Sequence, residues 1–87
     1  MTRPQQIFKK VVDAYSKAME KEFGDCAAFL YWFHDDESVS VDGTLHEVLN
    51  MDTMAFQNLY ENLDRALAKE GWFIENQNGT DHKFYRA

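Results

Sequence analysis

Apolar residues recur at steps of three and four in two separate parts of the chain. In residues 4–23 the repeat consists of Ile7, Phe8, Val11, Val12, Tyr15, Ala18, Met19 and Phe23. Between residues 52 and 71 it consists of Phe56, Leu59, Tyr60, Leu63, Ala66 and Leu67. This spacing aligns apolar side chains along one face of a helix. The sequence therefore predicts two long amphipathic helices.

The residues that flank the repeats also favour helices. Thr2 and Gln5 have the spacing of a capping box, and Pro4 suits the first turn because its missing N–H would be unpaired there anyway. Gly24 and Gly71 can adopt the left-handed conformation that ends a helix. Both predicted helices therefore have a plausible stop signal.

A dense aromatic segment, residues 26–34, follows the first helix and favours a β-strand. Strand alternation divides it into one face with Phe29, Tyr31 and Phe33 and another with Leu30, Trp32 and His34. Because both faces are mainly apolar, we expect a central strand that is covered on each side. After a turn, Val39 and Val41 predict a return strand, which gives a hairpin over residues 27–42.

The pattern beyond this hairpin predicts a short helix and a second hairpin. Leu45, Val48 and Leu49 have helical spacing. Residues 72–75 and 82–86 favour strands, and turn formers are abundant between them. We therefore predict one small α+β domain over residues 1–87. In it, two amphipathic helices and a short helix pack on antiparallel β-hairpins, in the order helix, hairpin, short helix, helix, hairpin.

The second half of this pattern resembles a winged helix-turn-helix domain. The resemblance rests on residues 44–49, a short break, a helix carrying Leu59, Leu63 and Leu67, then Gly71 and a hairpin. In that family the second helix of the pair enters the major groove of DNA, and the hairpin wing contacts the backbone. The resemblance implies a DNA-binding regulator whose contacts are supplied by Lys69, Lys83 and Arg86.

The charge distribution favours a different function. Residues 22–64, here called the acidic stretch, contain ten acidic residues and no lysine or arginine, although the whole chain has nine of these bases and a net charge of -6. Surfaces that serve solubility alone normally mix both signs. DNA affinity comes largely from lysine and arginine, yet the predicted recognition helix carries Glu61 and Asp64 before its first base, Arg65. The acidic stretch instead suits a basic protein partner.

Size and composition add limits on the class of protein. The chain has 87 residues, 45% of them hydrophobic, which is enough for a core in one small domain. Cys26 is the only cysteine, so no intramolecular disulfide can form, and we expect a reducing, cytoplasmic setting. We see no signal peptide at the start, and the longest apolar run is far shorter than the roughly 20 residues of a membrane span.

No motif for catalysis, metal binding or nucleotide binding stands out. His34 and the acids at 35–37 are metal-ligand types, but consecutive residues rarely converge on one ion, and a solvated turn is the simpler interpretation. Cys26 and the serines at 16, 38 and 40 have no evident base and orienting group, which nucleophilic catalysis requires. We therefore expect no enzymatic activity, no metal and no cofactor.

Two functional hypotheses follow, and a metal-dependent or thiol enzyme that would depend on Cys26 ranks well behind them. In the first, the chain is a small acidic protein-interaction module, an inhibitor or regulator that docks its acidic face on a basic, nucleic-acid-handling protein, without direct nucleic-acid binding. Exposed aromatic residues such as Trp32, Tyr60 or Trp72 would assist that docking. Small acidic inhibitors, many of them encoded by phages, are similar to this chain in size and charge alone. The alternative is the winged-helix DNA-binding regulator, with homodimer formation through the first helix left open. The predicted protein-binding residues are Asp35, Asp36, Glu37, Asp42, Glu47, Asp52, Glu61 and Asp64.

Overall fold

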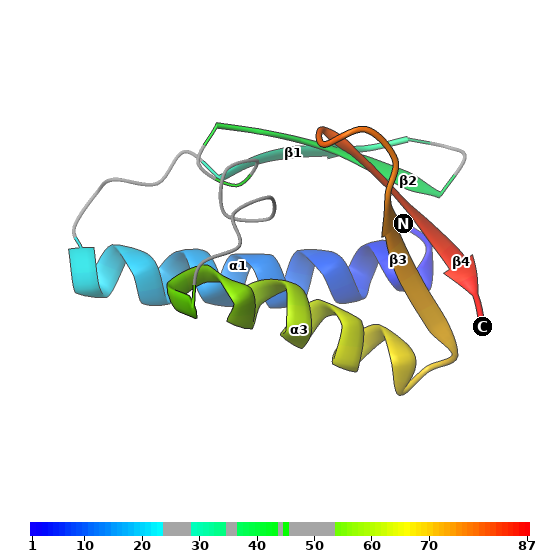
Figure 1. Cartoon of the computed structure of the whole chain (residues 1–87), viewed down its shortest axis with the longest axis horizontal. Coiled ribbons are helices and arrows are strands. Elements are labelled where there is room, and N and C mark those ends of the chain that lie inside the picture. The colour runs from blue at the N-terminus through cyan, green and yellow to red at the C-terminus, as the bar shows by residue number, and fades with distance from the viewer. Residues whose placement is uncertain (24–28, 35–36, 44, 46–53) are drawn as a thin grey trace.

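A computed structural model describes residues 1–23, 29–34, 37–43, 45 and 54–87 (Figure 1). Its elements are two helices and four strands: α1 (Arg3–Phe23), β1 (Phe29–Phe33), β2 (Ser38–Asp42), α3 (Met54–Ala68), β3 (Trp72–Asn76) and β4 (Asp81–Arg86). The predicted α+β class, both long helices and both hairpins are confirmed. The predicted short helix lies outside the described residues, apart from Leu45, which is buried in the core.

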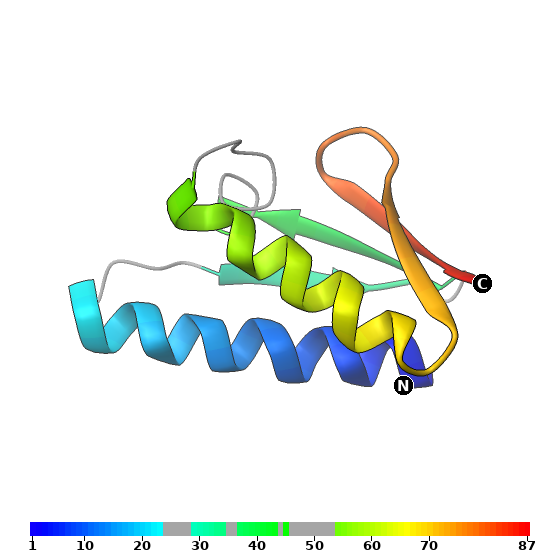
Figure 2. The ribbon, with the colours of Figure 1, turned by 60° about the horizontal axis from the view of Figure 1, so that its bottom comes forward.

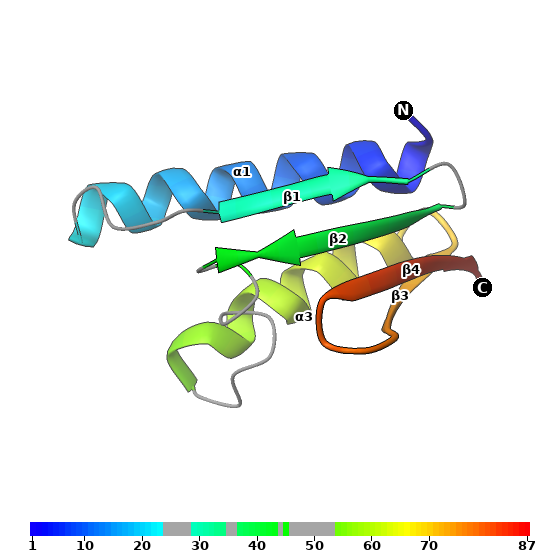
Figure 3. The same ribbon diagram turned by 90° about the horizontal axis from the view of Figure 1, so that it is seen from above.

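The four strands form one antiparallel sheet in the order β1-β2-β4-β3. The two predicted hairpins are joined at its centre, where Val39 of β2 pairs with His82 of β4. Two backbone hydrogen bonds extend this junction: Val41 N donates to Thr80 O at 2.8 Å, and Phe84 N donates to Glu37 O at 2.9 Å. Figure 3 shows β1, β2 and β4 side by side, with the helices behind them.

Both helices lie on the same side of the sheet, so the fold has two layers (Figures 1 and 2). This arrangement corrects the expectation that the aromatic segment forms a central strand covered on each side. β1 is an edge strand, and Leu30 and Trp32 are about half exposed, at 52% and 51%. The apolar alternation itself is confirmed, because Tyr31 and Phe33 pack against the core. In the described residues, nothing covers the other face.

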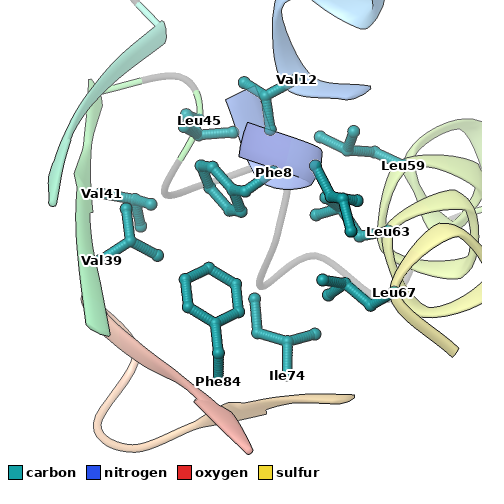
Figure 4. Close-up of a cluster of buried hydrophobic side chains, with 11 residues drawn as sticks. Phe8, Val12, Val39, Val41, Leu45, Leu59, Leu63, Leu67, Ile74 and Phe84 are labelled. Carbon is teal, nitrogen blue, oxygen red and sulfur yellow. The ribbon is translucent and has the colours of Figure 1, made fainter. Parts of the chain in front are cut away.

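The core lies between the helices and the sheet (Figure 4). Phe8 of α1 is fully buried and makes edge-to-face contacts with Tyr31, Phe33 and Phe84, at centroid distances of 5.4, 5.9 and 6.0 Å. The figure shows Phe8 between the β2 valines and the α3 leucines. The buried apolar residues are Ile7, Phe8, Val12, Val39, Val41, Leu45, Leu59, Leu63, Leu67, Ile74 and Phe84.

The predicted capping box at the start of α1 is present. Gln5 N donates to Thr2 Oγ1 at 3.4 Å, and Thr2 N donates to Gln5 Oε1 at 3.0 Å. The Gln5 amide also donates from Nε2 to the backbone oxygen of His34 at 3.1 Å. This buried side chain therefore satisfies the helix N-terminus and ties α1 to the end of β1.

Gly71 ends the segment after α3, as predicted. Its φ of 81° lies in the left-handed region that favours glycine. Gly71 N donates to Ala68 O, and Gly71 O accepts a hydrogen bond from Ala87 N at 2.8 Å. The turn therefore directs the chain into β3 and also holds the last residue.

Two further findings bear on function. In the described part of the chain there is no third helix, and the β3–β4 hairpin belongs to the four-stranded sheet, so a winged-helix arrangement is not shown. Neither α1 nor α3, as far as they are described, combines the length and apolar character needed to span a bilayer.

Candidate functional site

The face of the sheet that points away from the helices is the candidate site. Its side chains can be assigned because successive residues of a strand point to opposite faces. Val39 and Val41, Ile74, and His82 and Phe84 point into the core, so their neighbours on the same strands point outward. We call the resulting surface the outer sheet face. By this alternation it comprises Leu30, Trp32, His34, Ser38, Ser40, Asp42, Phe73, Glu75, Asp81, Lys83 and Tyr85, among which Ser38 and Ser40 are buried.

Apolar side chains on the outer sheet face gather at its two edges. On the β1 edge, Leu30 pairs across the strands with Asp42, and Trp32 pairs with Ser40. On the β3 edge, Phe73 is 41% exposed and stacks on Tyr85 with ring centroids 5.2 Å apart. Single exposed apolar residues are ordinary, but adjacent ones on a sheet without a covering layer are typical of interaction surfaces.

A polar network lies between these apolar patches. His34 Nε2 is 2.7 Å from Ser40 Oγ, and Ser40 Oγ is 2.5 Å from Asp81 Oδ1. An ionised carboxylate only accepts, so the Ser40 hydroxyl donates to Asp81 and His34 Nε2 donates to Ser40. The second carboxylate oxygen of Asp81 accepts a hydrogen bond from Asn78 at 3.1 Å. The network therefore links β1, β2 and the β3–β4 turn.

His34, Ser40 and Asp81 are the residue types of a hydrolase triad, but the hydrogen bonds connect them in a different order. In such a triad the imidazole accepts the serine proton, and the carboxylate holds the other imidazole nitrogen. Here the serine proton points to the carboxylate, and the imidazole donates to the serine oxygen. This arrangement holds the serine oxygen in place and does not activate it as a nucleophile. That the chain has no enzymatic activity stays a prediction.

The hydrogen bonds to Asp81 also set its acidity. The Ser40 hydroxyl, and secondarily the Asn78 amide, lower the pKa of the Asp81 carboxyl from its ordinary value of 3.8. Both donors favour the ionised form. Asp81 therefore keeps a negative charge in the middle of the outer sheet face across the neutral and mildly acidic range.

Removing the Ser40 hydroxyl should raise the pKa of Asp81. We expect the Ser40→Ala variant to titrate Asp81 nearer to its ordinary value, because the strongest donor to the carboxylate is lost. The folded-state pKa is lowered, so the stability that ionised Asp81 contributes is present above its unfolded pKa and is lost as the pH falls through the folded one. Ser40→Ala should therefore reduce the loss of stability that the protein shows when the pH falls through the pKa of Asp81. Carboxyl ¹³C NMR titration measures the pKa, with Ser16→Ala on α1 as the control. An unchanged Asp81 pKa in Ser40→Ala would contradict the assignment.

The predicted protein-binding acids are divided between the two layers. Glu37 lies in the β1–β2 turn with a φ of 61°, and Asp42 lies at the far end of β2 on the outer sheet face. Glu61 and Asp64 are on α3. Burial raises the pKa of Asp64. The other four predicted residues, Asp35, Asp36, Glu47 and Asp52, lie outside the described residues.

Two acids of the outer sheet face were missed because they follow the acidic stretch in sequence. Glu75 of β3 pairs with Lys83, and Asp81 pairs with Ser40. Together with Asp42 they give the outer sheet face three carboxylates against one lysine. In β4, His82 and Phe84 alternate with Asp81, Lys83 and Tyr85. This alternation could have placed Asp81 on the outer sheet face, once the inward side of β4 was identified. Of the predicted aromatic residues, Trp32 is on this face, whereas Tyr60 and Trp72 are partly buried against the core.

The cations expected to contact DNA come from different surfaces. Lys69 follows α3 in the helix layer, and Lys83 points outward from β4 with its Nζ 5.7 Å from the centre of the Tyr85 ring. Arg86 pairs with Trp72, and its guanidinium lies 5.0 Å from the centre of that ring. Lys83 therefore lies on the opposite face of the sheet from the helix layer that carries Lys69.

The metal interpretation of His34 and the neighbouring acids finds no support in the described residues. No group of three or more histidine, cysteine, aspartate or glutamate side chains there could hold an ion, and Asp35 and Asp36 lie outside them. Cys26 is also outside.

The fold and the site define a two-layer α+β protein with a sheet face that no described residue covers and that is both aromatic and acidic. In comparisons with protein-family models, with curated proteins and with solved structures, nothing matched this chain. The function is therefore argued from the outer sheet face itself.

Proposed function

We propose that the chain is a small acidic protein-interaction module that docks its outer sheet face on a basic, nucleic-acid-handling protein and inhibits or regulates it. The observation that carries this proposal is the exposure of Leu30 and Trp32 beside the Asp42 carboxylate. An exposed aromatic anchor next to fixed negative charge matches a partner surface that is rich in arginine.

Arginine satisfies both features of this face at once. Its planar guanidinium stacks on an aromatic ring and pairs with a carboxylate, and lysine does the first less well. The chain itself contains such a contact between Arg86 and the Trp72 ring. Trp32, with Asp42 on the adjacent strand β2 and Asp81 one strand further on β4, offers the same chemistry to a partner. The net charge of -6 would speed the encounter with a basic surface.

The nucleic-acid-handling class is proposed because such proteins carry extensive arginine and lysine surfaces. A module that covers such a surface with its own carboxylates would exclude the nucleic acid from it. The likeness to small phage-encoded inhibitors is one of size and charge alone. The alternative, a winged-helix DNA-binding regulator, has less support because Lys83 lies on the outer sheet face and Lys69 lies in the helix layer.

A capture experiment tests the proposed function. The tagged chain is incubated with lysate of its native host after nuclease treatment, at low and at high salt. We expect a basic nucleic-acid-handling protein to be retained at low salt and released at high salt, because the contacts between exposed charges are screened. The purified partner should then lose its nucleic acid when the chain is added.

Two matched variants identify the docking face. Asp42→Lys and Glu61→Lys make the same charge change at exposed positions, the first on the outer sheet face and the second on α3. We expect Asp42→Lys to reduce capture strongly and Glu61→Lys to retain most of it. If both variants lost capture equally, the loss would be explained by the change in net charge alone. That result would contradict the assignment of the outer sheet face as the docking surface. Partners that disappear on nuclease treatment would favour the DNA-binding alternative.

A further inference from the structure

A groove between the two helices forms a second surface, in the helix layer and not on the outer sheet face. All of its lining residues belong to α1 or to residues 62–70, and it encloses about 610 Å³. Figure 2 shows the C-terminal end of α3 beside the N-terminal end of α1, the two segments that supply the lining residues. Small-molecule sites in proteins commonly have volumes of about 300 to 1,000 Å³. The groove is therefore large enough for a small ligand.

The floor of the groove is apolar. Ile7, Val11 and Tyr15 line it from α1, and Ala66 lines it from α3. Ile7 is buried in the core, whereas the other three are only partly covered. An occupant must therefore offer an apolar body to this surface.

An internal ion pair is among the residues that line the groove. Arg3 Nε and Nη2 each lie 2.7 Å from a carboxylate oxygen of Glu70. This bidentate contact joins the first turn of α1 to the residue before Gly71. It also lowers the pKa of the Glu70 carboxyl. Arg3 and Glu70 therefore neutralise each other and leave the charge of the groove to other residues.

Two lysines supply that charge. Lys10 of α1 and Lys69, just after α3, both line the groove. Both are exposed, and within the described residues neither ammonium group has an ion-pair or side-chain hydrogen-bond partner. Although the whole chain is acidic, this groove combines an apolar floor with two cations that are available to a ligand.

We propose that the interhelical groove binds a small amphiphilic carboxylate, whose tail lies on the apolar floor and whose head group is held by Lys10 and Lys69. Charge complementarity selects an anion, and the floor selects an apolar body. A second copy of the chain fits less well, because a two-fold contact through the groove would bring its lysines close to one another. Duplex nucleic acid has no apolar body for the floor and is repelled by the net charge.

The test is an NMR titration of the full-length ¹⁵N-labelled chain with sodium dodecanoate, kept below its micelle concentration. We expect saturable binding, with amide shift changes concentrated in residues 7–15 and 62–70. Shortening the tail to octanoate should weaken binding by about two- to four-fold per methylene, because each buried methylene contributes to transfer from water. Acetate should cause no saturable change.

Lysine variants separate the groove from other surfaces. Each of Lys10→Gln and Lys69→Gln should weaken dodecanoate binding by up to about five-fold, the effect of one exposed ion pair. Lys17→Gln on α1 and Lys83→Gln on β4 are the matched controls and should leave the affinity unchanged. These four lysines lie outside the apolar core, and amide spectra verify the fold of each variant.

Three outcomes would overturn the proposal. They are an unchanged affinity in the Lys10→Gln/Lys69→Gln double variant, acetate binding as tight as dodecanoate binding, and shift changes confined to the outer sheet face around Trp32. Capture of a protein partner does not depend on any of them, so this proposal and the proposed function can fail separately.

Discussion

Replacing Phe8 with alanine should lower the free energy of unfolding by about 3 to 5 kcal/mol, the largest effect that we expect from any single substitution. Phe8 is fully buried and is the aromatic residue that contacts Tyr31, Phe33 and Phe84 together. Its removal leaves a cavity between the helices and the sheet. Small domains have a total stability of about 5 to 15 kcal/mol, so a considerable part of the molecules should unfold at moderate temperature.

Urea denaturation followed by circular dichroism measures this loss. Phe73→Ala is the matched control, because it deletes the same side chain from the outer sheet face, where Phe73 is partly exposed. Its cost should be about 1 kcal/mol, mainly from the lost stacking on Tyr85. Similar costs for the two variants would contradict the position of Phe8 at the centre of the core.

Replacing Trp32 with alanine should weaken binding of the captured basic partner by about 30-fold, which corresponds to about 2 kcal/mol. Tryptophan is among the residues on which binding energy is most often concentrated in protein interfaces. Trp32 is half exposed on an edge strand, beside Asp42 and Ser40 of β2. It would lose most of this exposure on docking, whereas its removal costs the free chain little.

Binding kinetics by surface plasmon resonance distinguish the two parts of the docking face. Trp32→Ala should mainly increase the dissociation rate, because it removes a packed contact. Asp42→Lys should mainly decrease the association rate and the dependence on salt, because it changes the steering field. Full affinity in a folded Trp32→Ala variant would rule out this edge of the sheet as the docking surface. Amide spectra and unfolding curves provide the control for folding.

The sequence predicted the individual elements well because their signals are local. The spacing of Phe8 and Val12, or of Leu59, Leu63 and Leu67, determines which face of each helix is buried. The contacts between Thr2 and Gln5 involve residues three apart, and Gly71 acts within one turn. Such features depend on near neighbours in the chain and can be inferred from a single sequence.

The arrangement of the sheet could not be predicted in this way. Ser40 and Asp81 are hydrogen-bonded although they are 41 residues apart in the sequence. No local sequence pattern predicts that β2 and β4 are neighbours in the sheet. The apolar residues of β1 were interpreted as a doubly covered strand, because periodicity does not distinguish an apolar face that is covered by a second layer from one that is exposed. For the same reason, a contiguous stretch of acids was a poor guide to which carboxylates share a surface.

The central pairing of β2 with β4 makes the two halves of the chain interdependent. Among the described elements, each half is one helix followed by one hairpin, and the halves meet through the β2–β4 junction and the packing of α1 on α3. A lone two-stranded hairpin is marginally stable in water, and three or more strands with an apolar face are needed for independent stability. Neither half is therefore a complete folding unit. The two halves of this single polypeptide cover each other's apolar surfaces, in the way that two complementary fragments of a protein do. Loss of either half would therefore expose the apolar face of the other.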